Sequence, residues 1–200
     1  MEYIKIPTPV MKQLNEDLKQ NKRFKNNMFA GTEWEALFPA KTLMDLFGEE
    51  LSKIVSTLLG YEVQEQRKDK ETGHDHYAKG LGRVEDKGIR AEGSIINQIR
   101  PNNGFDYLRV IAVNTTVTKV YQCSVNDLFR KVREDEEIKT HRTPHGKEKF
   151  TVDGLDYFEG WVSLYPWITI NNGFAINTTK IEEFSKVATL IAEGDMYWEN

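Results

Sequence analysis

Cysteine, long apolar runs and an excess of positive charge are what this sequence has least of. Its 200 residues contain one cysteine, Cys123, so no internal disulfide can form, and without a Cys/His framework we expect no structural zinc site. No apolar run reaches the roughly 20 residues of a membrane-spanning helix. The first residues also lack the basic-then-apolar order of a signal peptide. We therefore expect a cytoplasmic protein with no membrane partner.

The charge balance limits the kind of partner. The formal net charge is −4, with 27 basic and 31 acidic residues. A protein that coats nucleic acid is usually strongly basic, because neutralising phosphates supplies its affinity. The balance argues against that class, but not against an enzyme with an acidic metal site and local basic groups. The hydrophobic fraction of 39% and the charged fraction of 29% fit one ordinary globular domain.

The spacing of apolar residues predicts a single α/β domain over residues 1–200, with its core at about 40–170 and a mixed sheet flanked by helices. The two periodicities, 3.6 and 2 residues, assign the elements. Helices are expected at 10–25, 40–59, 124–132 (capped by Ser124) and 181–191. Strands are expected at 61–66, 105–114 and 117–122, with a β-hairpin at 74–79 and 83–89. Residues 133–149 are expected to form a loop, and the aromatic stretch 158–170 to return to the core.

The hairpin carries the residues that suggest chemistry. Asp75 opens its first strand, and Glu85-Asp86-Lys87 lies on its second. The spacing from Asp75 to Glu85 is enough to cross the turn and return, so the two carboxylates are expected side by side on adjacent strands. Glu85 and Lys87 share a face because side chains alternate along a strand, and Asp86 points to the other face. Two carboxylates and one ammonium should therefore converge.

Hydrolysis of a phosphodiester requires groups of these kinds. Paired carboxylates hold a hard divalent cation such as Mg²⁺ through oxygen ligands. The metal polarises the phosphate and lowers the pKa of a bound water. A neighbouring ammonium positions that water and offsets negative charge in the transition state.

The arrangement resembles the PD-(D/E)xK nuclease superfamily, in which a helix acid, an Asp and a Glu-x-Lys dyad form the active site. The resemblance implies a restriction-endonuclease-like core and a Mg²⁺-dependent enzyme that cuts double-stranded DNA at a short recognition sequence. It assigns the catalytic roles to Asp75, Glu85, Lys87 and the helix acid Glu50, and makes the backbone carbonyl of Asp86 a further metal ligand. His74 stands where the family usually has Pro.

Two further segments carry the resemblance to type II restriction endonucleases, so that it covers about residues 43–165. Gly-Ser-Ile-Ile-Asn-Gln-Ile-Arg-Pro at 93–101 leads into the next core strand, and a His/Gly/Lys-rich loop at 140–147 precedes an aromatic strand. On this reading the DNA contacts come from Arg100, His141, Arg142 and Lys147. The resemblance also implies a homodimer acting on a palindromic site, and a cognate DNA methyltransferase as a possible companion.

Several alternatives stay open on the sequence alone. Arg90 and Glu92 offer a competing dyad register with the charges exchanged, and Glu49 competes with Glu50 as the helix acid. The hairpin residues also fit an ordinary exposed hairpin with cross-strand ion pairs. For function, the alternatives are a repair or nicking nuclease of the same fold and a catalytically inactive DNA-binding module.

Overall fold

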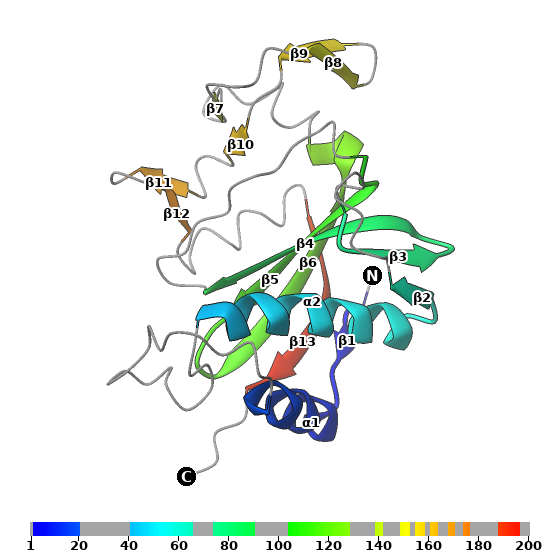
Figure 1. The fold of residues 1–200 in the computed structure, drawn as a ribbon, viewed down its shortest axis with the longest axis vertical. Helices are drawn as coiled ribbons and strands as arrows, with labels where there is room; N and C mark the ends of the chain where they lie inside the picture. Colours follow the sequence, from blue (N-terminus) through cyan, green and yellow to red (C-terminus); the bar gives the residue numbers. More distant parts are fainter. Residues whose placement is uncertain are drawn as a thin grey trace.

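A computed structural model describes residues 2–20, 41–65, 74–90, 104–128 and 188–196, together with six short strands between positions 139 and 176. Figure 1 shows the arrangement of these parts: helices α1 (Thr8–Lys19) and α2 (Lys41–Leu58) lie on one side of a curled sheet, and the short strands lie on the other. The described part of the chain is therefore a mixed α/β structure, as the sequence predicts.

The main sheet has seven strands in the order β1-β13-β6-β5-β4-β3-β2. The β1/β13 and β4/β5 pairs are parallel and the other four pairs are antiparallel, so the sheet is mixed. The strands are β1 (Ile4–Lys5), β2 (Glu62–Glu65), β3 (His76–Lys79), β4 (Gly82–Arg90), β5 (Tyr107–Val113), β6 (Val117–Ser124) and β13 (Thr189–Asp195).

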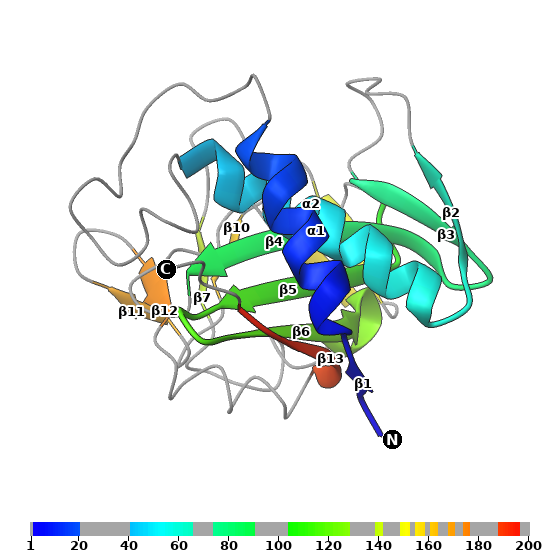
Figure 2. The ribbon, with the colours of Figure 1, turned by 90° about the horizontal axis from the view of Figure 1, so that it is seen from below.

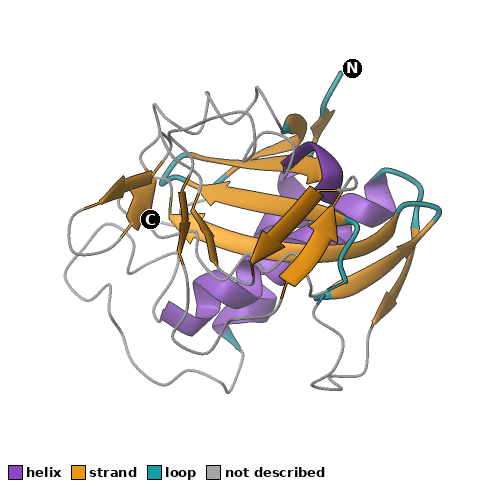
Figure 3. Cartoon of the chain, turned by 90° about the horizontal axis from the view of Figure 1, so that it is seen from above, coloured by secondary structure: helices purple, strands orange, loops and turns teal. Residues whose placement is uncertain are grey.

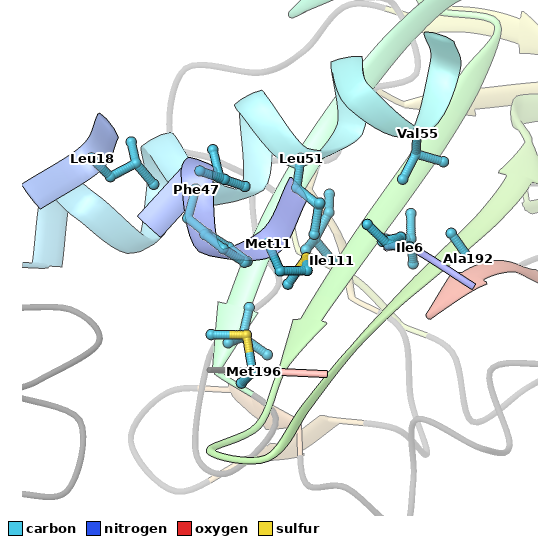
Figure 4. Close-up of a cluster of buried hydrophobic side chains, with 12 residues drawn as sticks. Ile6, Met11, Leu18, Phe47, Leu51, Val55, Ile111, Ala192 and Met196 are labelled. Carbon is cyan, nitrogen blue, oxygen red and sulfur yellow. The ribbon is translucent and has the colours of Figure 1, made fainter. Parts of the chain in front are cut away.

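The hydrophobic core lies between the two helices and one face of the sheet. Figure 2 shows both helices crossing the same face. Every third or fourth residue of each helix is apolar, so each presents a stripe to the sheet. The cluster is drawn in Figure 4 and includes Met11, Leu14 and Leu18 from α1, Phe47, Leu51 and Val55 from α2, and Ile111, Val113, Val120 and Ala192 from the strands. Burial of each of the larger side chains contributes about 1.5–3 kcal/mol.

Strand β5 lies within the strand expected at 105–114 and is the middle strand of the sheet. Six of its seven residues are buried, because β4 and β6 pair with its two edges and both of its faces are covered. Alternation sends Arg109, Ile111 and Val113 towards the helices and Leu108 and Val110 towards the opposite face. The same alternation in β4 divides its polar residues between the two faces.

The short strands form three antiparallel pairs on the side of the sheet opposite the helices, in front of it in Figure 3. They are β7 (Lys139–His141) with β10 (Trp161–Ser163), β8 (Lys149–Val152) with β9 (Leu155–Phe158), and β11 (Ile168–Ile170) with β12 (Phe174–Ile176). The loop expected at 133–149 is therefore wrong over β7, which pairs with β10 some distance along the chain, and at Lys149, which begins a hairpin with the next strand.

The turn after β6 confirms a predicted helix cap. The N–H of Asp127 donates a hydrogen bond of 3.0 Å to Oγ of Ser124, and residues 125–128 are helical. This is the bond that an N-cap serine makes to the first turn of a helix. The rest of the predicted helix, beyond residue 128, lies outside the described residues.

The predicted final helix, 181–191, is wrong over its last part. Residues 181–187 lie outside the described residues, but Thr189, Leu190 and Ile191 begin strand β13, between β1 and β6. A short apolar run fits a buried strand as well as one face of a helix, and local periodicity does not separate them. The pairing partners are far away in sequence, at residues 4–5 and 117–122, and the two-residue strand β1 carried no recognisable signal.

In the part of the chain that the structure describes, neither helix is long and apolar enough to cross a membrane.

Candidate active site

The β3–β4 hairpin positions the site. Gly80, with φ of 95°, makes the tight turn, and the N–H of Leu81 donates to the carbonyl of Ala78 at 2.9 Å. His76 is paired with Val84. One residue further out, the N–H of Asp75 donates to the carbonyl of Val84 at 2.9 Å, which extends the hairpin and sets Asp75 opposite Glu85.

The structure brings Asp75, Glu85 and Lys87 together on one face of the sheet. Oδ2 of Asp75 accepts a hydrogen bond of 2.6 Å from the backbone N–H of Asp86. Nζ of Lys87 forms an ion pair with Oε1 of Glu85, and these two side chains are only 21% and 10% exposed. Because Asp86 faces α2 and side chains alternate along β4, Glu85 and Lys87 point to the sheet face opposite the helices.

The electrostatics of this group show a shortage of positive charge. Burial raises the pKa of Glu85 to about 7, the ammonium of Lys87 opposes the rise, and the carboxylate of Asp75 adds to it. Burial also raises the pKa of Asp75, against the hydrogen bond from the Asp86 backbone. Two carboxylates held close together and away from water, with one lysine beside them, favour a further cation.

The donors present suit Mg²⁺. Among the described residues there is no group of three or more His, Cys, Asp or Glu side chains that could hold a metal ion. Mg²⁺ does not need such a cage, because it usually keeps several waters and takes one or two carboxylates together with substrate phosphates. Asp75 and Glu85 supply those two carboxylates. The role expected for the backbone carbonyl of Asp86 stays a prediction.

Glu50, the expected helix acid, lies elsewhere. It lines a groove of about 420 Å³ between α1 and α2, next to Leu14 and Asp17, and its Oε1 accepts from Nζ of Lys53 at 2.8 Å. Helix α2 packs on the sheet face that Asp86 occupies, so Glu50 is not brought to the carboxylates on the opposite face. The sequence pattern placed Glu50 at the edge of an apolar stripe, but did not indicate which neighbour that edge meets.

A buried polar network on the helix face was missed by the sequence analysis. Nδ1 of His76 lies 2.8 Å from Oδ2 of Asp86, and Nε2 of His76 lies 3.2 Å from Oγ of Ser56 on α2. The guanidinium of Arg109 donates to the same hydroxyl at 2.6 Å. Side chains alternate along both strands, so His76 points to the other face of the sheet from Asp75, as Asp86 does from Glu85. The sequence could therefore have indicated that His76 and Asp86 share a face.

Arg109 connects this network to the next strand and to α2. Its Nε donates to Oε1 of Gln122 at 2.8 Å, and its Nη1 donates to the carbonyl of Ser52 at 2.8 Å. Burial lowers the pKa of Arg109 to about 10, and the charge of Asp86 on the neighbouring strand acts against that shift. Arg109 is fully buried and is therefore a structural cation rather than a surface group for DNA.

The expected DNA contacts are mostly untested. Arg100, Arg142 and Lys147 lie outside the described residues. His141 ends β7, where its backbone is paired with that of Trp161. Of the alternative dyad, Arg90 ends β4 and Glu92 lies outside the described residues.

Asp106 forms a two-point ion pair with Arg83. The contacts, at 2.9 and 3.0 Å, link the starts of β4 and β5.

Fold and site together define a mixed α/β protein with one buried carboxylate (Glu85), one partly buried carboxylate (Asp75) and a lysine on one sheet face. Comparisons of the chain with protein-family models, curated proteins and solved structures found no match.

Proposed function

We propose that this chain is a Mg²⁺-dependent endonuclease that hydrolyses phosphodiester bonds of double-stranded DNA at a short recognition sequence. The observation that carries the proposal is the convergence of Asp75, Glu85 and Lys87 from two adjacent strands. A restriction-endonuclease-like core is part of the same proposal. The order of α2, the β3–β4 hairpin and the parallel strand β5 supports it.

In this function Asp75 and Glu85 hold the ion. The raised pKa values of both carboxyl groups support this role, because a bound cation would restore their charged forms. When bound, Mg²⁺ supplies a Lewis acid for a phosphate oxygen and lowers the pKa of its water. The N–H of Asp86 fixes one oxygen of Asp75 and leaves the other available.

Lys87 acts on the attacking water and on the phosphate. Its ammonium lies against Glu85, so it is held at the carboxylates instead of moving freely in solvent. There it orients a water molecule for attack on phosphorus and offsets the charge that develops on the phosphoryl oxygens. The bond from phosphorus to the leaving oxygen breaks, and that oxygen takes a proton from water.

Two partners follow from the proposal. Cutting both strands of a palindromic site requires two active sites related by a two-fold axis, which a homodimer provides. A restriction enzyme also requires protection of host DNA, which a methyltransferase would provide.

The test is incubation of the purified protein with unmethylated plasmid and phage DNA in Mg²⁺ or in EDTA, followed by electrophoresis. Discrete bands that need Mg²⁺ and are lost in Asp75→Asn support the proposal. Nicked or diffusely degraded DNA contradicts the sequence-specific part and favours the repair or nicking nuclease. No cleavage of any DNA, modified or unmodified, overturns the enzymatic assignment and favours a binding module.

A further inference from the structure

Asp86 links the buried network on the helix face to the proposed active site through hydrogen bonds on both sides of the sheet. Its carboxylate faces α2 and bonds His76, and both side chains are 0% exposed. Its backbone N–H bonds Oδ2 of Asp75, whose carboxylate faces the opposite side of the sheet. Asp86 also stands between Glu85 and Lys87 in the chain. The position of its backbone therefore affects all three residues of the site.

The donors and acceptors of the network form one continuous chain. Arg109 donates to Oγ of Ser56, which lies 3.2 Å from Nε2 of His76, and we assign the hydroxyl proton to this second contact. His76 then carries its proton on Nδ1 and donates it to Asp86. The network also brings the guanidinium of Arg109 and the carboxylate of Asp86, both buried, into one cluster. The network ties α2, β5, β3 and β4 together at a single point.

The order Ser56, His76, Asp86 matches that of a nucleophilic triad, but burial rules out that role. Ser56 and His76 are both 0% exposed, beneath α2, where no substrate can reach the hydroxyl. Arg109 also donates to Oγ of Ser56, which withdraws electron density from the would-be nucleophile. The network therefore acts through the positions of the strands and the helix that it connects.

The network is also a costly way to stabilise a helix–sheet contact. Oδ1 of Asp86 and Nη2 of Arg109 are buried and have no hydrogen-bond partner among the residues that the structure describes. A buried polar atom without a partner costs about 1–3 kcal/mol. Apolar residues of similar volume often serve such an interface equally well or better. What polar groups add is direction: a hydrogen bond between His76 on β3 and Asp86 on β4 fixes how these two strands lie relative to each other.

We propose that His76 and Asp86 are positioning residues: the bond from Nδ1 of His76 to Asp86 fixes the backbone of β4 so that the N–H of Asp86 holds Asp75 beside Glu85 and Lys87. The catalytic part of this inference rests on the proposed nuclease function. The geometric part, a dependence of the Asp86–Asp75 bond on His76, does not.

Two substitutions of His76 separate positioning from general stability. In His76→Asn the amide nitrogen replaces Nδ1 and keeps the donor to Asp86. In His76→Gln the amide nitrogen replaces Nε2, keeps the contact with Ser56 and loses the donor to Asp86. Both variants exchange the ring for a primary amide in the same cavity. Ser52→Ala, which removes one acceptor of Arg109 at the same interface, is the control.

The first measurement is the NMR signal of the residue 86 amide in the full chain without metal. We expect its hydrogen-bonded chemical shift and slow hydrogen exchange to persist in His76→Asn and Ser52→Ala and to be lost in His76→Gln. If His76→Gln does not fold, Asp86→Asn is compared with Asp86→Ala, which differ in whether an acceptor remains for His76. Equal amide signals within the pair of variants that is used would overturn the proposal.

The second measurement is the single-turnover cleavage rate at saturating Mg²⁺, at a temperature where every variant is folded. We expect His76→Gln to be about 10–100-fold slower than His76→Asn, the usual effect of losing a group that orients a metal ligand. Equal rates would overturn the catalytic part. If the wild-type protein cleaves no DNA, the proposed function fails, and the amide signal still decides whether His76 and Asp86 position Asp75.

Discussion

Gly48 of α2 crosses β4 at Gly88 so closely that a Cβ on Gly48 would lie 2.9 Å from the Cα of Gly88 and 3.2 Å from its nitrogen. These atoms belong to backbone and cannot move aside as a flexible side chain would. The helix therefore touches the strand that carries Glu85 and Lys87, one turn before Ser52 meets Arg109. This contact sets the distance between the helix layer and the proposed site.

Gly48→Ala tests this contact, because the contact and helix propensity predict opposite changes in the free energy of unfolding. Helix propensity alone predicts that Ala stabilises a helix interior by about 1 kcal/mol relative to Gly. The clash with Gly88 opposes that gain, and overpacking of this kind costs about 1–3 kcal/mol. We expect a net loss of stability in urea unfolding. Thr57→Ala, on the exposed side of the same helix, is the control and should stay within about 0.5 kcal/mol of wild type. A stabilised Gly48→Ala would contradict the contact.

The raised pKa of Glu85 predicts that ionisation of this side chain lowers the free energy of unfolding. Its rise from 4.5 to about 7 means that the folded state binds the proton more tightly than the unfolded state does. Stability therefore falls as pH rises from about 4.5 to 7; the penalty is absent below that window and complete, at roughly 3 kcal/mol, above it. Glu85→Gln removes the penalty.

We expect Glu85→Gln to gain about 2 kcal/mol relative to wild type between pH 5 and pH 8 in urea unfolding. Glu62→Gln, at an exposed carboxylate paired with Lys79, is the matched control and should show little change. A difference between Glu85→Gln and wild type that does not depend on pH would show that Glu85 is not held away from water.

Lys87 is expected to matter for cleavage more than for folding. Lys87→Met removes the ammonium beside Glu85, and we expect the single-turnover rate to fall by about 10²–10⁴, the usual contribution of a group that positions or transfers a proton. Lys79→Met, on the neighbouring strand, is the control. It removes an exposed lysine whose ion pair with Glu62 contributes little to stability. Its rate should equal that of wild type. Equal rates for both variants would remove Lys87 from the proposed site.

Arg109 is the cation that balances Asp86. Arg109→Met leaves the Asp86 carboxylate buried without a positive partner, and we expect a loss of about 3–5 kcal/mol in urea unfolding. Adding Asp86→Asn to that variant removes the uncompensated charge and should recover part of the loss. A loss below about 1 kcal/mol in the single variant would mean that the two charges are not coupled.

Much of the architecture around the site was predictable from local pattern. Two short segments around a glycine-containing turn identified the β3–β4 hairpin, and the alternation of side chains along a strand separated Glu85 and Lys87 from Asp86. Residues at three- and four-residue spacing identified α2, and the mostly apolar run at 107–113, interrupted by Arg109, identified β5 as a strand. These predictions succeeded because each depends on neighbours within a few residues along the chain.

The errors have a common physical origin. Residues 189–191 of β13 were predicted as helix because a short apolar run fits both periods, and the partners of this strand lie far from it in the sequence, at residues 4–5 and 117–122. The strand at 139–141 was predicted as loop because its pairing with β10 leaves no local signal. Glu50 was assigned to the site because periodicity gives the direction of a side chain from its helix, and not the element it meets.

The sequence by itself determined the candidate residues, their division between the two faces of β4 and the approach of Asp75 to Glu85, because alternation and a tight turn are local properties. The tertiary structure decided the environment of those residues. It placed α2 on the face of Asp86, gave His76 a buried partner and raised the pKa of Glu85 to about 7. Burial and electrostatic coupling depend on segments far apart in the chain, so only the packed structure shows them.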